Sequence, residues 1–80
     1  MNTALQEFAR QTLKDGLGRL PAGSQRIFKL MYGRGAYVRG EPARTVEETE
    51  SLTIHQVVDE MAADKLDWAM QQVERTLQKQ

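Results

Sequence analysis

Near the start of the chain, apolar residues recur at the spacing of one helix face. This face comprises Leu5, Phe8, Ala9, Leu13 and Leu17. The pattern predicts a helix from Thr3 to about Leu17. Thr3 and Gln6 match a capping box, in which a hydroxyl and an amide satisfy each other's free backbone donors. Gly18 and Pro21 favour the end of the segment just beyond it.

A second apolar group predicts a helix from Ser24 to Tyr32. Its apolar positions are Ile27, Phe28, Leu30 and Met31. Ser24 suits the N-cap and Gly33 suits the position after the last turn. Because only a short glycine- and proline-containing link separates this helix from the first, we expect an antiparallel helical hairpin.

The segment from Gly33 to Leu52 interrupts the helical pattern. Its three glycines and Pro42 disfavour a helix. Short alternating stretches at Ala36–Arg39 and Arg44–Glu47 allow a small β-hairpin. The alternative is a long loop across residues 33–52, which is unusual in so short a chain.

From Thr53 onward the pattern is helical again, but it changes phase. The first apolar stripe comprises Ile54, Val57, Val58 and Met61, and the second comprises Leu66, Met70, Val73 and Leu77. In one continuous helix these stripes would point about 120° apart. Either the helix breaks near Ala62–Asp64 or one long helix carries two apolar faces. We favour the break, because the charge of Asp64 suits the start of a new helix.

Trp68, the only tryptophan, lies off the stripe of its own helix. Helical geometry places it about 160° from the centre of the Leu66–Leu77 stripe. So large an aromatic side chain needs cover. It is covered by another part of the chain, by a second copy, or by a different protein, for which tryptophan is a typical hot spot.

Length and composition limit the remaining choices. We expect one all-α domain over residues 1–80, with three to four short helices and a long central loop. The core of so small a domain is marginal. With no cysteine and one histidine, disulfides and a multi-histidine metal site are excluded, so oligomerisation or partner binding remains as additional stabilisation. No apolar run suits a membrane span, and the first residues do not resemble a secretory signal, so we expect a cytoplasmic protein.

The formal charge of zero conceals two blocks of opposite sign. Residues 19–44 hold six basic residues and one acid, and residues 45–64 hold six acids and no lysine or arginine. The simpler interpretation is mutual neutralisation within the fold. The other is a bipolar surface that orients a charged partner.

The residues give little support to catalysis, and we predict no enzyme, cofactor or metal site. His55 has Ser51 and Thr53 nearby and Asp59 one helical turn later. A pair four residues apart is ordinary on a helix surface, and nothing else suggests a concave catalytic site.

Nucleic-acid binding by residues 19–44 is the alternative function. Arg34, Tyr37 and Arg39 interleave stacking and phosphate-binding side chains. However, base-reading residues are scarce and the neighbouring acids would repel phosphate. We therefore favour a protein-binding surface, with the following candidate residues: Trp68, Met61, Arg75, Gln72, Tyr37 and Arg39.

The stretch VVDEMAADKLDWAMQQVERTLQK (residues 57–79), with FKLMYG (residues 28–33), resembles small accessory proteins of tailed phages and prophages. The resemblance covers about half of the chain and brings no catalytic motif. It implies stoichiometric binding to one host protein, which blocks or modulates defence, cell division or surface machinery. With this resemblance, the expected cytoplasmic location is the host cell. A homodimer is a further option, because self-association would cover Trp68 and supplement the small core.

Overall fold

The computed structural model describes residues 3–35 and 42–79, and this part of the chain is all-α. It contains no strand, and its helices are α1 (Thr3–Gly18), α2 (Ala22–Tyr32), α4 (Val46–Glu50), α5 (Ile54–Glu60) and α6 (Ala63–Gln78). The all-α class is therefore confirmed, and α4 was not foreseen.

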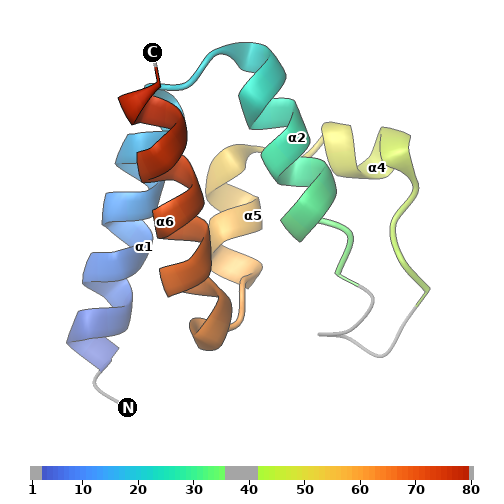
Figure 1. Ribbon diagram of the computed structural model, residues 1–80. Coiled ribbons are helices and arrows are strands. Elements are labelled where there is room, and N and C mark those ends of the chain that lie inside the picture. Colours follow the sequence, from blue (N-terminus) through green and yellow to red (C-terminus); the bar gives the residue numbers. More distant parts are fainter. Residues whose placement is uncertain (1–2, 36–41, 80) are drawn as a thin grey trace.

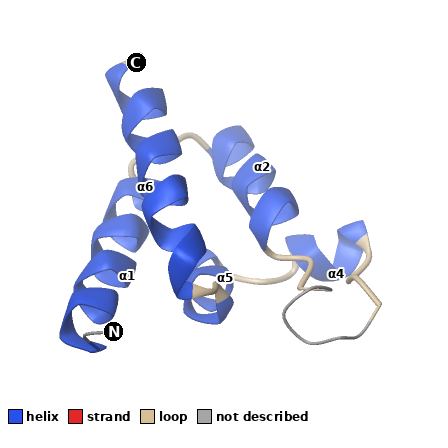
Figure 2. Ribbon diagram, turned by 60° about the horizontal axis from the view of Figure 1, so that its bottom comes forward, coloured by secondary structure: helices blue, strands red, loops and turns tan. Residues whose placement is uncertain are grey.

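The helices form a flat assembly, with extents of 33 × 33 × 16 Å. α1 and α6 lie side by side and run in the same direction, whereas α2 runs in the opposite direction (Figure 1). α5 contacts both α1 and α2, and α4 packs against α2 on the side away from α1 (Figure 2). α6 makes its most extensive contact with α1.

One apolar core joins the helices. Its buried members are Leu13, Leu17, Leu20, Phe28, Val57, Val58, Met61, Leu66, Ala69 and Val73. α1 and α6 approach closely at Gly16, where an added Cβ would lie 2.9 Å from Cγ1 of Val73. The predicted stripe of α6 faces this core, since Leu66 and Val73 are buried and Met70 and Leu77 pack against it.

The predicted break between the last two helices is confirmed. α5 ends at Glu60 and α6 starts at Ala63, with Asp64 in its first turn, where a negative charge favours the helix dipole. Thr53 caps α5 as predicted, and the side chain of Gln56 completes a capping box.

Three local predictions are wrong. Thr3 is not the N-cap of α1, because the helix already includes it. Ser24 is not the N-cap of α2, because the helix already begins at Ala22, after Pro21. Arg44–Glu47 is not a strand, because Thr45 and Glu48 form a capping box that starts α4. The other half of the predicted hairpin, Ala36–Arg39, lies outside the described residues.

Gly33 follows α2 as expected, but for a different reason. Its φ of −96° is right-handed, so the left-handed conformation that favours glycine is not required. Gly33 is buried, and an added Cβ would lie 2.6 Å from the Lys29 carbonyl oxygen and 3.1 Å from side-chain carbons of Thr49 and Val57. The end of α2 therefore needs glycine for space against α4 and α5.

Long polar side chains from elsewhere in the chain close the C-terminal ends of four helices. These contacts are Gln25 Nε2 to the Leu17 and Leu20 carbonyls, Lys29 Nζ to those of Glu50 and Leu52, Arg10 Nη1 to those of Val58 and Met61, and Arg44 Nη1 to that of Gly33. Each donates to carbonyl oxygens at or just beyond the end of a helix, where the regular pattern of backbone hydrogen bonds stops. The fold is thus tied together by polar as well as apolar contacts.

Candidate protein-binding groove

The described residues expose more large apolar side chains than the helical pattern predicts. Leu5 and Phe8 on α1 and Ile27 and Met31 on α2 are 59–70% exposed, although the sequence pattern assigned all four to core faces. That assignment is wrong. In α1, Phe8 lies about 140° around the helix from the buried Leu13, so α1 docks through Leu13 and turns Phe8 to solvent.

A groove of about 220 Å³ runs between α2 and α6. It forms because α2 packs on α4 and α5 while α6 packs on α1, which leaves α2 and α6 without an extensive contact of their own. Its lining contains no charged residue and comprises Leu20, Ser24, Ile27, Phe28, Met31, Tyr32, Gln72, Val73 and Thr76. Ile27 and Met31 are largely exposed along the α2 wall, while Phe28 and Val73 are buried in its floor.

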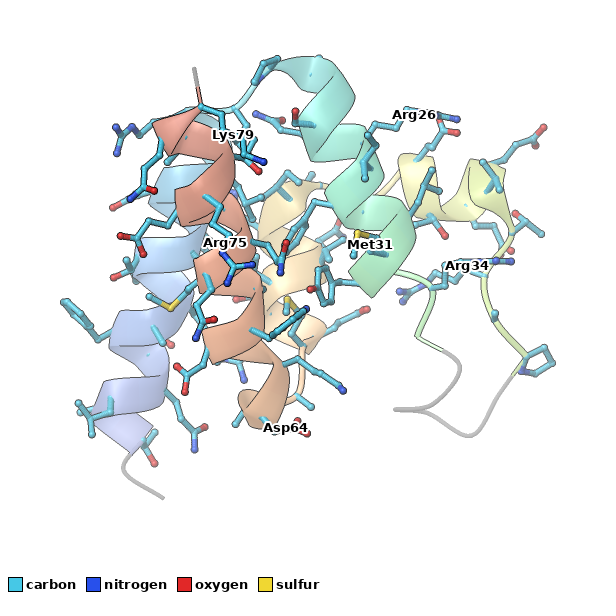
Figure 3. All side chains as sticks on the ribbon, in the orientation of Figure 1. Arg26, Met31, Arg34, Asp64, Arg75 and Lys79 are labelled. Atoms are coloured by element: carbon cyan, nitrogen blue, oxygen red, sulfur yellow. The ribbon has the colours of Figure 1, made fainter. Side chains whose placement is uncertain are left out.

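Of the candidate binding residues on α6, only Gln72 lines the groove. Gln72 and Thr76 line it, and the Thr76 hydroxyl donates a 2.9 Å hydrogen bond to the Gln72 carbonyl. Trp68 lies one turn before Gln72 and is 53% exposed, so it is not part of the core. Arg75 on α6 and Met31 on α2 are visible on one side of the molecule (Figure 3).

The aromatic part of the groove floor includes a buried polar atom. The rings of Phe28 and Tyr32 lie 4.7 Å apart between centroids. Within the described residues, the Tyr32 hydroxyl oxygen is buried and makes no hydrogen bond. Burial raises the pKa of this phenol, because the charged form loses its hydration.

The candidate binding residues have different outcomes. Trp68, Gln72 and Arg75 share one side of α6, as their spacing predicts. Met61 lies in the core at 5% exposure and does not share that surface. Tyr37 and Arg39 lie outside the described residues.

Sequence reasoning missed Ile27 and Met31 as surface residues. Both lie within about 100° of the buried Phe28 around the helix, so helical spacing alone does not separate them from the core.

Opposite charges in residues 19–64 pair with each other, as the simpler interpretation expected. Arg44 Nη1 lies 2.7 Å from the Glu60 carboxylate, and Arg26 Nη2 lies 3.0 Å from that of Glu50. The hydrogen bond from Arg26 lowers the pKa of the Glu50 carboxyl. Arg34 Nε donates to the Arg44 carbonyl at 2.9 Å.

His55 lies on α5 and is exposed. The Asp59 carboxylate, one turn later, is 2.8 Å from Lys14 Nζ on α1. This hydrogen bond lowers the pKa of Asp59. The Ser51 hydroxyl donates to the Glu48 carbonyl, and the Thr53 hydroxyl caps α5. These hydroxyl and carboxyl groups therefore support helix ends and packing.

No protein-family model, curated protein or solved structure matches this chain. Across residues 3–35 and 42–79, no cluster of three or more His, Cys, Asp or Glu residues is placed to hold a metal ion. No helix in the same ranges has the length and apolar content needed to cross a membrane.

Proposed function

We propose that this chain is a small protein-binding module of the phage accessory type. It binds one host protein stoichiometrically in the host cytoplasm and inhibits or modulates it by covering a surface. The observation that carries the proposal is the uncharged α2–α6 groove, whose apolar wall of Ile27 and Met31 is exposed together with Trp68 on the neighbouring helix.

The composition of this surface suits binding. Tryptophan and arginine are enriched among residues that contribute most to protein interfaces, and Trp68 and Arg75 are seven residues apart on α6. Met31 adapts its shape to a partner more easily than a branched side chain does. Complete burial of an exposed side chain of this size contributes about 1.5–3 kcal/mol, so a few such residues supply much of an affinity.

The nucleic-acid alternative receives less support. Among the described basic residues of segment 19–44, Arg26 and Arg44 are paired with carboxylates and Lys29 is bound to backbone carbonyls. Among the described cations of this segment, Arg19 and Arg34 are left without a carboxylate partner to neutralise phosphates.

The proposal is tested by two substitutions in the groove and one matched substitution outside it. Met31→Asp and Trp68→Ala should abolish or strongly weaken capture of a host protein from bacterial lysate, followed by gel filtration and mass spectrometry. Phe8→Asp, at an equally exposed position on α1, is the control. Far-ultraviolet circular dichroism should show unchanged helicity in all three variants.

The proposed surface would be wrong if both groove variants, while folded, captured the same protein as the unaltered chain. It would also be wrong if Phe8→Asp alone abolished capture. Unfolding of Trp68→Ala would assign Trp68 to the core, and Met31→Asp would then decide the question.

A further inference from the structure

We infer that the α2–α6 groove accepts an amphipathic helix of the partner, with acidic residues beside its apolar face. This inference rests on the proposed function and specifies the chemistry of the partner. Its basis is the shape of the groove together with an uneven distribution of charge around α6.

The groove lies between two helices, and its lining residues repeat once per helical turn on each wall. Its walls are two helices that run in opposite directions (Figure 1). The buried apolar residues of its lining are Leu20, Phe28 and Val73. On α2, Ile27 and Met31 are one turn apart; on α6, Gln72 and Thr76 are one turn apart. A helix with apolar residues at i, i+3 or i+4, and i+7 matches walls with this repeat.

Charged residues are segregated around α6. Lys65 and Lys79 are each seven residues from the groove-lining Gln72, so they lie within about 20° of it. Arg75 lies about 60° from Gln72 and about 100° from Thr76, at the outer edge of this wall. Asp67 and Glu74 lie about 140° and 160° away from Gln72, on the far side. Asp64, at about 80°, is the nearest acid, in the first turn of the helix.

The groove-side cations are available to a partner. Lys65, Arg75 and Lys79 are exposed, and within the described residues none of them makes a salt bridge. Figure 3 shows Arg75 and Lys79 along α6, with Met31 on the adjacent helix. The groove therefore joins an apolar floor to a basic rim, which complements a helix with acidic flanks.

Two other occupants fit this surface less well. A second copy related by a two-fold axis would bring the basic rim against itself, and like charges across an interface are unfavourable. A nucleic acid would meet Ile27 and Met31, which offer no flat surface for base stacking, and a floor without cations.

The test is selection from a display library of random 16-residue peptides against the full chain. Selected peptides should carry the i, i+3 or i+4, i+7 apolar spacing and net negative charge. Trp68, the only tryptophan, reports their binding by a change in fluorescence. Met31→Asp should weaken the selected peptides by about tenfold or more, and Phe8→Asp should leave them unchanged.

A charge-reversal variant, Arg75→Glu with Lys79→Glu, tests the rim separately. It should weaken the acidic peptides by about tenfold and, in a fresh selection, favour basic ones. A random single-stranded DNA oligonucleotide tests for nucleic-acid binding. If the chain binds it in a salt-dependent way, and Met31→Asp does not weaken this binding, the inference is overturned.

The remaining outcomes separate the two proposals. The selected peptides could depend on Met31 and yet be neutral or basic, or be non-helical by circular dichroism when bound. Either result overturns the inference of an acidic helical partner and retains the groove as a binding site. A selection that yields no peptide, or only peptides indifferent to Met31→Asp, overturns both.

Discussion

The two sides of α6 differ in how closely they meet the rest of the molecule. Where α6 meets α1, Gly16 and Val73 approach closely. Leu66 and Ala69 of α6 are almost completely buried in the core. Towards α2, Gln72 and Thr76 line an open groove, and Trp68 is half exposed. One helix thus supplies both core and surface. The closed side should determine stability, and the open side should be free to change with little effect on folding.

The largest predicted contrast compares two residues on this helix. Leu66→Ala removes a side chain that is 1% exposed and should lower the free energy of unfolding by about 3 kcal/mol. Trp68→Ala should lower it by less than about 1 kcal/mol, since the indole is already largely in water. Urea denaturation followed by circular dichroism measures both. Similar losses from the two variants would contradict the contrast.

The close approach of α1 and α6 is tested by two glycines in the same turn. Gly16→Ala would place its Cβ 2.9 Å from Cγ1 of Val73, a stiff and buried side chain. We expect a loss of about 1–2 kcal/mol, because overpacking outweighs the better helix propensity of alanine. At Gly18 an added Cβ meets nothing within 4 Å, so Gly18→Ala should be neutral or stabilising. Thermal unfolding of both variants should give shifts of opposite sign or clearly different size.

A smaller effect is expected at the start of α5, which supports the closed side through Val57 and Val58. Thr53→Ala removes the hydroxyl oxygen that accepts a hydrogen bond from the backbone N–H of Gln56. It should lower the free energy of unfolding by about 1 kcal/mol. Thr53→Ser keeps the hydroxyl and serves as the control. Equal losses in both variants would show that the methyl group, and not the cap, is responsible.

These helix ends also show which parts of the fold the sequence predicts. The capping box of Thr53 and Gln56 is visible because both partners lie three residues apart in one segment. By contrast, Arg10 closes the end of α5 from 48 and 51 residues away. No local pattern indicates such a partner, so a contact of this kind cannot be predicted from the segment whose end it supports.

The groove between α2 and α6 was only partly predictable, for a related reason. Trp68 stands out because it departs from the stripe of its own helix, and this signal is local. Ile27 and Met31 conform to a helical face and become exposed only because α2 and α6 dock on different neighbours. Met61 was misplaced by the same limitation, since its burial depends on how α5 and α6 meet.

The smallest predicted effect is a pH dependence of stability that arises from the Lys14–Asp59 ion pair between α1 and α5. The hydrogen bond from Lys14 lowers the pKa of Asp59 in the folded protein below its value in the unfolded chain, about 3.9. The unfolded state therefore takes up a proton first on acidification. The stabilising contribution is complete above about pH 4–5 and is lost as the pH falls through the folded-state pKa.

Asp59→Asn should therefore make the free energy of unfolding fall less steeply between about pH 5 and pH 2. The effect should be modest, because the Asp59 side chain is 59% exposed and solvent screens the pair. In a Lys14→Met background, the same substitution should change the pH dependence less, because the hydrogen bond that lowers the pKa is gone. An equal effect of Asp59→Asn in both backgrounds would show that Lys14 does not set this pKa.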